Sequence, residues 1–246
     1  MTDERAIARI RDEALQVARG WSGPDAAPTW RLTASLFECL AGDTQLSELA
    51  SSIPPERLPP LLFVASVQRV AARHRGDRFG AYFPIAGGVQ PPLDDQFASR
   101  YRAFCLEHHD ELAQVQSERV YQMNEVARCT QVALALGVLQ RMQPGRNIAL
   151  VDVGTGSGLG LYLDRYHYGL SDGRQWGASD SQVRIDCELQ GPLRPLLPPP
   201  ATIDHRVGVD LNPLDLDDEE ERAWLAACIP PEAGALRRVA SAIEVA

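Results

Sequence analysis

The chain has 246 residues, 45% of them hydrophobic, which is enough for one large or two smaller domains with a buried core. Its 33 acidic and 24 basic residues give a net charge of −9, which argues against a nucleic-acid partner or an anionic membrane surface, because both need a basic face. All 24 basic residues are arginine, so a lysine-containing phosphate loop and a Schiff-base lysine are excluded.

Cysteine usage and the N-terminus indicate a cytoplasmic protein. The five cysteines are scattered and form no C-x-x-C pair, so they predict buried apolar side chains rather than a disulfide framework or a local zinc site. The N-terminus lacks the apolar core of a signal peptide, and no run approaches the roughly 18 apolar residues of a membrane span. We therefore expect no membrane partner.

Apolar spacing predicts that the first half of the chain is helical. The expected helices are 3–21, 28–40, a short helix that begins at Asp43 and ends before Pro54, 58–73, and 94–118. The run from Leu61 to Val67 predicts that 58–73 is buried over most of its circumference. His108 and His109 lie in the last helix without further ligands at helical spacing, so we expect no metal site.

Residues 121–142 are predicted to form one helix with two different halves. The run Val132–Leu139 is apolar all round and should be packed inside. In the first half, five polar or aromatic residues fall on one arc of roughly 120°, namely Tyr121, Asn124, Glu125, Arg128 and Gln131. This arc is either a solvated face with an Arg–Glu pair or a polar wall that faces the next element, since only 143–146 intervene.

The next element, 147–158, joins an apolar run to three glycines at two-residue spacing. The run from Ile148 to Val153 predicts a parallel strand buried on both faces, with Asp152 near its carboxyl end, where open α/β sheets place ligands. Gly154, Gly156 and Gly158 can take positive φ and let a ligand approach the backbone closely.

The remaining elements are shorter. A brief helix should follow Gly158, and 183–189 alternates apolar and polar residues like a half-exposed strand. A second strand is expected at 203–213, ending in an acid. Helices are expected from the acidic turn at 217–221 to about Cys228, and again after Pro231.

The glycine spacing selects between known cofactor loops. A dinucleotide fingerprint starting at Gly154 would place Leu159 at its last glycine position, which disfavours a nicotinamide-dependent oxidoreductase. The pattern Asp152-x-Gly154-x-Gly156-x-Gly158 instead resembles the first motif of class I S-adenosylmethionine-dependent methyltransferases. The resemblance implies that the loop lies against the methionine part of the cofactor and that Asp210, with Asn212 beside it, ends the second strand and holds the ribose hydroxyls.

Two departures from that pattern shape the expected fold. The two acids are 58 positions apart, against about 20 in a compact nucleotide-binding unit, so an inserted strand and loop are expected between about 169 and 201. Only 36 residues follow Asp210, too few to complete the sheet. We therefore predict an α/β protein with a helical domain, 1–145, and a partial Rossmann-like, methyltransferase-type domain with an inserted strand, 146–246.

Seven segments spread along the chain carry a wider resemblance: Tyr82–Gly88, Phe104–Leu112, Gln122–Cys129, the glycine stretch, Asp164–Tyr166, Cys187–Leu189 and Val207–Pro213. In these segments the chain resembles an uncharacterised family of bacterial proteins, frequent in actinobacteria, that is known as a domain of unknown function. Members are usually longer and continue into further methyltransferase-like strands, so this chain looks like a C-terminally shortened member.

The leading hypothesis is a methyltransferase-like protein that acts on a small-molecule acceptor. Its S-adenosylmethionine pocket would be lined by Asp152, Gly154, Gly156, Gly158, Asp210 and Asn212. Glu125 would be the base, Asn124 and Arg128 would orient the acceptor, and Arg165 and Tyr166 would close the pocket. The alternative is a non-catalytic remnant or interaction module that associates with itself through an unpaired strand edge.

Overall fold

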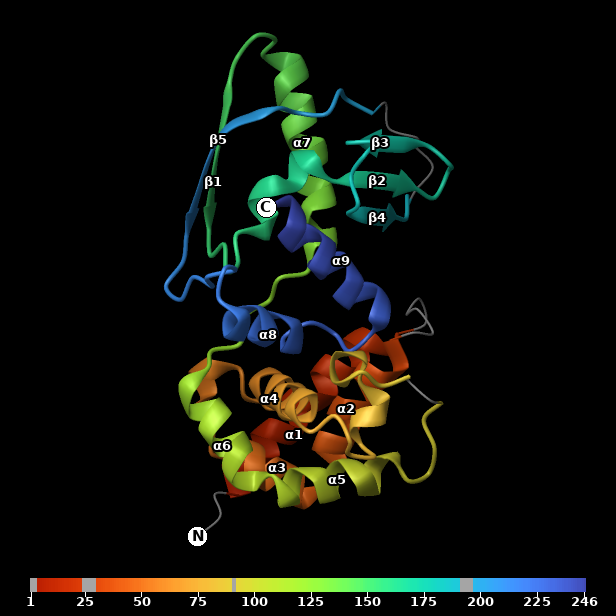
Figure 1. The fold of residues 1–246 in the computed structure, drawn as a ribbon, viewed down its shortest axis with the longest axis vertical. Helices are drawn as coiled ribbons and strands as arrows, with labels where there is room; N and C mark the ends of the chain where they lie inside the picture. Colours follow the sequence, from red (N-terminus) through yellow and green to blue (C-terminus); the bar gives the residue numbers. More distant parts are fainter. Residues whose placement is uncertain (1–3, 24–29, 90–91, 191–196) are drawn as a thin grey trace. The chain divides into compact units, whose positions relative to one another are not determined.

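The computed structural model describes residues 4–23, 30–89, 92–190 and 197–246. It is an α/β protein with a helical N-terminal region and small sheets, as the sequence predicts (Figure 1). Its contacts divide the chain into two compact units, Met1–Gln122 with Ala223–Leu236, and Met123–Arg222 with Arg237–Ala246. The predicted division into two domains, 1–145 and 146–246, stays a prediction.

The first unit contains the helices α1 (Glu4–Trp21), α2 (Arg31–Gly42), α3 (Thr44–Ser51), α4 (Pro59–Arg73), α5 (Phe97–Glu107) and α6 (His109–Glu118). Short 3-10 turns lie between these helices. The turn η2 (Pro55–Arg57) precedes α4, and η3 (Gly80–Tyr82) and η4 (Pro84–Ala86) follow it. Asp43 caps α3, because its side chain accepts hydrogen bonds from the amides of Gln45 and Leu46 in the first turn of that helix. The predicted start of the second helix at Pro28 lies outside the described residues.

The helix α4 forms the centre of this unit. Of its 15 residues 12 are buried, which confirms the expected burial over most of its circumference. It packs against α1, α2, α3 and α6 (Figure 1). None of the described helices combines the length and the apolar content that a membrane span needs.

The predicted continuous helix 94–118 is wrong, because the chain breaks at His108. The amide of His108 donates to Phe104 O and ends α5, and the amide of Leu112 donates to His108 O and opens α6. The break lets both helices bury an apolar side, with Phe104 and Cys105 on α5 and Leu112 and Val115 on α6.

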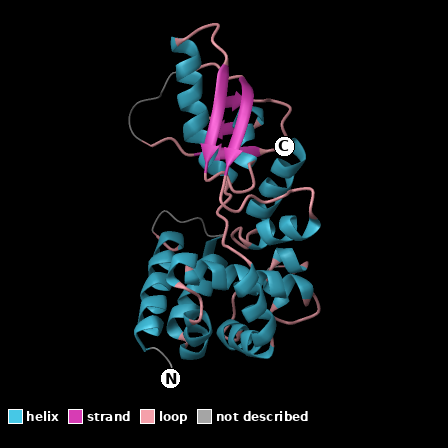
Figure 2. Cartoon of the chain, turned by 90° about the vertical axis from the view of Figure 1, so that its left-hand side faces the viewer, coloured by secondary structure: helices cyan, strands magenta, loops and turns pink. Residues whose placement is uncertain are grey.

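In the second unit, β1 (Ile148–Val153) pairs in parallel with β5 (Ile203–Val209), so the predicted two strands do lie side by side (Figure 2). Between them the chain forms η6 (Leu159–Arg165) and a separate sheet of β2 (His167–Leu170), β3 (Gln175–Gly177) and β4 (Arg184–Cys187), in the order β3-β2-β4. The expectation of a single inserted strand is therefore wrong. The helices α8 (Glu219–Ala227) and α9 (Ala233–Val245) form where they were predicted, and each has residues in both units.

The prediction that β1 is buried on both faces is also wrong. On one face Val151 and Val153 are 60% and 80% exposed, and their register partners Val207 and Val209 are 52% and 51% exposed. Only the opposite face is covered, where η6 packs against both strands. We refer to the four exposed side chains as the valine face.

The helix predicted over 121–142 begins only at Cys129, as α7 (Cys129–Met142), after the 3-10 turn η5 (Val126–Arg128). Residues 119–125 have no helical structure, because the side chains of Asn124 and Glu125 bind backbone amides instead of pointing into solvent. The apolar half of α7 is not enclosed either. Its buried residues are small and four apart, Cys129, Ala133 and Gly137, while Val132, Val138 and Leu139 are exposed.

Candidate functional site

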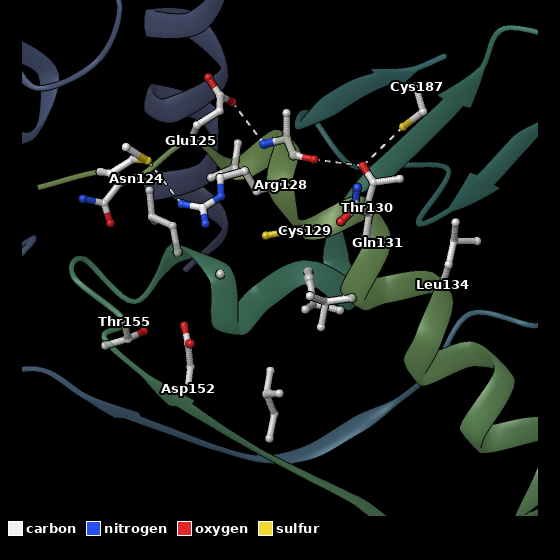
Figure 3. A pocket seen from close by; sticks show the side chains of 18 of the residues that line it. Asn124, Glu125, Arg128, Cys129, Thr130, Gln131, Leu134, Asp152, Thr155 and Cys187 are labelled. Atoms are coloured by element: carbon white, nitrogen blue, oxygen red, sulfur yellow. Dashed lines mark hydrogen bonds between the residues drawn. The ribbon is translucent and has the colours of Figure 1, made fainter. Parts of the chain in front are cut away.

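A cavity of about 850 Å³ lies in the second unit (Figure 3). Its wall is formed by 123–134 around η5 and the start of α7, by 150–163 around the glycine turn and η6, and by Leu170 with 186–189 near β4. The size falls within the range of about 300–1,000 Å³ that is usual for small-molecule sites. Its position at the carboxyl end of β1 is where parallel sheets place ligands.

The glycine turn has the backbone conformation that its sequence predicts. Gly154, Gly156 and Gly158 all have positive φ, between 58° and 81°. The amide of Gly154 donates to Val209 O at 2.7 Å, which fixes the turn to the end of β5. Gly154 lines the cavity, whereas Gly156 and Gly158 are not among the residues that line it.

Asp210 is brought to this turn, but it does not line the cavity. Its Oδ2 accepts a hydrogen bond from the amide of Gly156 at 2.7 Å, and its Oδ1 accepts one from the amide of Asn212 at 2.8 Å. Asn212 is likewise outside the wall. In this conformation the Asp210 carboxylate therefore holds the glycine turn and the loop after β5.

Asn124, Glu125 and Arg128 all line the cavity, although they lie on an extended segment and a 3-10 turn rather than on a helix. Asn124 contacts the glycine turn directly. Its Oδ1 accepts from the amide of Ser157 at 3.0 Å and from the Ser157 hydroxyl at 2.7 Å. Of the two interpretations of these polar residues, a wall against the glycine turn is the one that this contact matches.

Glu125 is already engaged within the unit. One carboxylate oxygen accepts from the amide of Ala127, and the two oxygens bind Arg238 Nε at 3.1 Å and Nη2 at 3.2 Å. A bidentate pair with a guanidinium occupies both carboxylate oxygens and fixes their orientation. In this conformation it is poorly placed to accept a proton from a substrate.

Arg165 and Tyr166, predicted to close the pocket, do not line this cavity. Arg165 donates to Val245 O at 3.3 Å and lies over the ring of Tyr162 at 5.2 Å. Tyr166 is fully buried and its hydroxyl donates to Leu159 O at 2.6 Å. Burial raises the pKa of Tyr166, so its phenol stays protonated.

Of the five charged side chains in the wall, four make no ion pair within the described residues, namely Arg128, Asp152, Asp186 and Glu188. Within the part of the chain that the structure describes, the Asp152 carboxylate makes no hydrogen bond or ion pair, and Arg128 makes no ion pair and donates only to Met123 Sδ, at 3.3 Å. Both charges act on the thiol of Cys129. The pKa of Cys129 is raised to about 11, chiefly by burial and also by the charges of Asp152 and Glu125, while the charge of Arg128 opposes the rise.

Comparison with known proteins identifies the family of this chain. Residues 21–246 match the model of a family described as "Uncharacterized protein conserved in bacteria (DUF2332)". The chain belongs to this family. No curated protein and no solved structure gives a match.

The DUF2332 match covers both units. The wall of the cavity also contains side chains that the glycine spacing alone does not predict as part of a site. Cys129 and Thr155 are the clearest of these. A protonated, mostly buried thiol is inert as a nucleophile, so Cys129 shapes the cavity rather than reacting in it. Asp152 extends from β1 toward the turn that carries Arg128 and Cys129 (Figure 3), so the cavity presents a carboxylate and a guanidinium on different walls.

Proposed function

We propose that this DUF2332 protein binds S-adenosylmethionine in the cavity of its second unit, which would then be a partial Rossmann-like, methyltransferase-like domain. The observation that carries the proposal is that Asp152 and Arg128, two opposite charges without an ionic partner among the described residues, line one cavity beside the glycine turn. A ligand that carries both an ammonium and a carboxylate group can bind Asp152 with the first and Arg128 with the second. The methionine part of S-adenosylmethionine is such a ligand.

The charge of the lining also favours this ligand class. The wall contains four carboxylates, of Glu125, Asp152, Asp186 and Glu188, and one guanidinium, of Arg128. Arg238 compensates one of the carboxylates, so the cavity still has an acidic excess. An acidic cavity attracts a cation, and the sulfonium of S-adenosylmethionine is cationic. The likeness of the glycine pattern to the first motif of class I methyltransferases supports the same ligand.

Methyl transfer to a small-molecule acceptor is the second step of the proposal. Transfer requires the acceptor to be held in line with the sulfonium and, for a hydroxyl or amine, to lose a proton. Asn124 and Arg128 would orient the acceptor, and Glu125 would take the proton after the acceptor displaces Arg238 from its carboxylate. Binding and transfer are thus separable, because only transfer requires Arg238 to move.

Calorimetric titration with S-adenosylmethionine and with S-adenosylhomocysteine tests the binding step. Asp152→Asn and Arg128→Gln each remove one charge-assisted contact, so each should weaken binding roughly tenfold or more. Asp180→Asn and Arg184→Gln are matched controls, because both side chains are exposed and outside the cavity. The absence of binding at millimolar ligand, or equal affinities in the site and control variants, would refute the proposal.

The valine face supports a second candidate function, a module that associates with a second copy of the chain. Four exposed valines form a contiguous apolar surface, and within the described residues both strands of the β1–β5 pair have one unpaired edge. The same face on two copies can pair about a twofold axis. Sedimentation should then show a concentration-dependent dimer that Val153→Thr weakens. A monomer at every concentration would exclude this function.

A further inference from the structure

Three side chains in the first unit come together near the end of α4. His74 is the residue that ends α4, His108 lies at the break between α5 and α6, and Glu111 is in the first turn of α6. One ligand atom of each lies within 4.8 Å of the others. His74 Nε2 is 2.7 Å from Glu111 Oε2, and the two imidazole rings have centroids 4.0 Å apart.

An aromatic side chain of α5 packs against both histidines of this group. The buried ring of Phe104 contacts His108 at a centroid distance of 4.5 Å and His74 at 6.5 Å. His108 lies between the two helices with its ring beside that of His74, whereas His109 begins α6 and contacts Asp110. All three side chains are partly exposed, so an ion can reach them from solvent.

The donors match the requirements of a transition-metal ion. Two imidazole nitrogens and one carboxylate oxygen form a ligand set used by zinc sites that leave a fourth position open. Ligand atoms around a tetrahedral Zn²⁺ lie roughly 3.3 Å apart, so small side-chain rotations bring the donors, now within 4.8 Å, to that spacing. The carboxyl ends of α4 and α5 both lie here, and helix carboxyl ends favour a positive charge.

An ordinary ion pair explains only part of this cluster. Arg73 Nη1 binds Glu111 Oε1 at 3.0 Å and His74 binds Oε2, which together account for the carboxylate. Neither contact involves the ring of His108, which makes no hydrogen bond or ion pair within the described ranges of the chain. A metal ion on Oε2 would use this nitrogen as well, and Arg73 would remain on Oε1 as an outer partner that orients the ligand.

We propose that His74, His108 and Glu111 bind a divalent transition-metal ion, with Zn²⁺ as the best fit, and leave one position open to water. The proposal concerns the first unit alone and does not depend on ligand binding in the second. It also revises the expectation of no metal, which rested on the histidine pair having no further ligands at helical spacing. His74 and Glu111 supply them from elsewhere in the fold.

Metal titration of the full, tag-free chain tests the site. After treatment with a chelator, the protein should bind one equivalent of Zn²⁺, measured by competition with a chromophoric chelator. Co²⁺ should give the intense visible absorption of a four-coordinate site, and Zn²⁺ should abolish it. His108→Ala should weaken binding at least roughly tenfold while leaving the contact between His74 and Glu111 in place.

His109→Ala is the matched control, because the ring of His109 is exposed, pairs with Asp110 and lies outside the cluster. This variant should bind the metal like the unchanged chain. Equal affinities in the His108 and His109 variants, or no stoichiometric binding by the unchanged chain, would overturn the proposal. Because the Co²⁺ spectrum is recorded on the unchanged chain, the test holds even where a variant fails to fold.

Discussion

Replacing Asp210 tests whether this side chain stabilises the glycine turn or serves only to bind a ligand. In Asp210→Ala the buried amide of Gly156 loses a charged acceptor at 2.7 Å, and the amide of Asn212 loses one at 2.8 Å. A buried donor left without a partner costs about 1–3 kcal/mol, and a typical hydrogen bond in an exposed loop adds up to about 1 kcal/mol. We therefore expect Asp210→Ala to lower the free energy of unfolding by about 1–4 kcal/mol.

Asp210→Asn should cost less, about 1 kcal/mol, because the amide oxygen can still accept from Gly156. Urea unfolding followed by far-ultraviolet circular dichroism measures both losses, and hydrogen exchange at the Gly156 amide locates the effect. Asp180→Ala is the control, since that exposed carboxylate contacts nothing in the turn. If Asp210→Ala is as stable as this control and the Gly156 amide stays protected, Asp210 does not hold the turn and the reasoning fails.

Three further changes test other parts of the fold. Burial raises the pKa of Glu232 above its usual 4.5, so the folded state binds this proton more tightly and stability falls as the pH rises from 4.5 through the folded-state pKa; Glu232→Gln should flatten that part of the curve of melting temperature against pH, and an unchanged slope would contradict it. A Cβ on Gly208 would lie 2.6 Å from Thr155 Cγ2, so Gly208→Ala should cost about 1–3 kcal/mol in urea unfolding. Adding Thr155→Ser, which removes that methyl group, should restore part of the loss. Asp43→Ala removes the cap of α3 and should cost about 0.5–2 kcal/mol, whereas Asp43→Asn should melt close to the unchanged chain.

Most helices could be predicted because their signals are local. The start of α3 follows from Asp43, which caps it, and the burial of α4 follows from the apolar run Leu61–Val67. The apolar residues of β1 and β5 likewise predict the two strands themselves. In each case the residues that decide the element lie within it or directly beside it.

The wall of the candidate site could not be placed correctly because its structure depends on distant partners. Asn124 and Glu125 have helical spacing with Arg128, but Asn124 binds Ser157 and Glu125 binds Arg238, both far away in the sequence. These contacts replace the helix that periodicity alone favours. Arg128 lines the same cavity, but among the described residues it has no ionic partner that fixes it.

Burial also depends on distant partners, and for this reason the sequence wrongly predicts that both faces of β1 are buried. A run such as Ile148–Val153 shows that the residues are apolar, but burial is set by what packs on each side. Here η6 packs against both strands on one face, while β2, β3 and β4 form a separate sheet instead of extending the β1–β5 pair. The inserted segment contributes to the candidate site instead, because Leu170 and 186–189 complete the wall of the cavity.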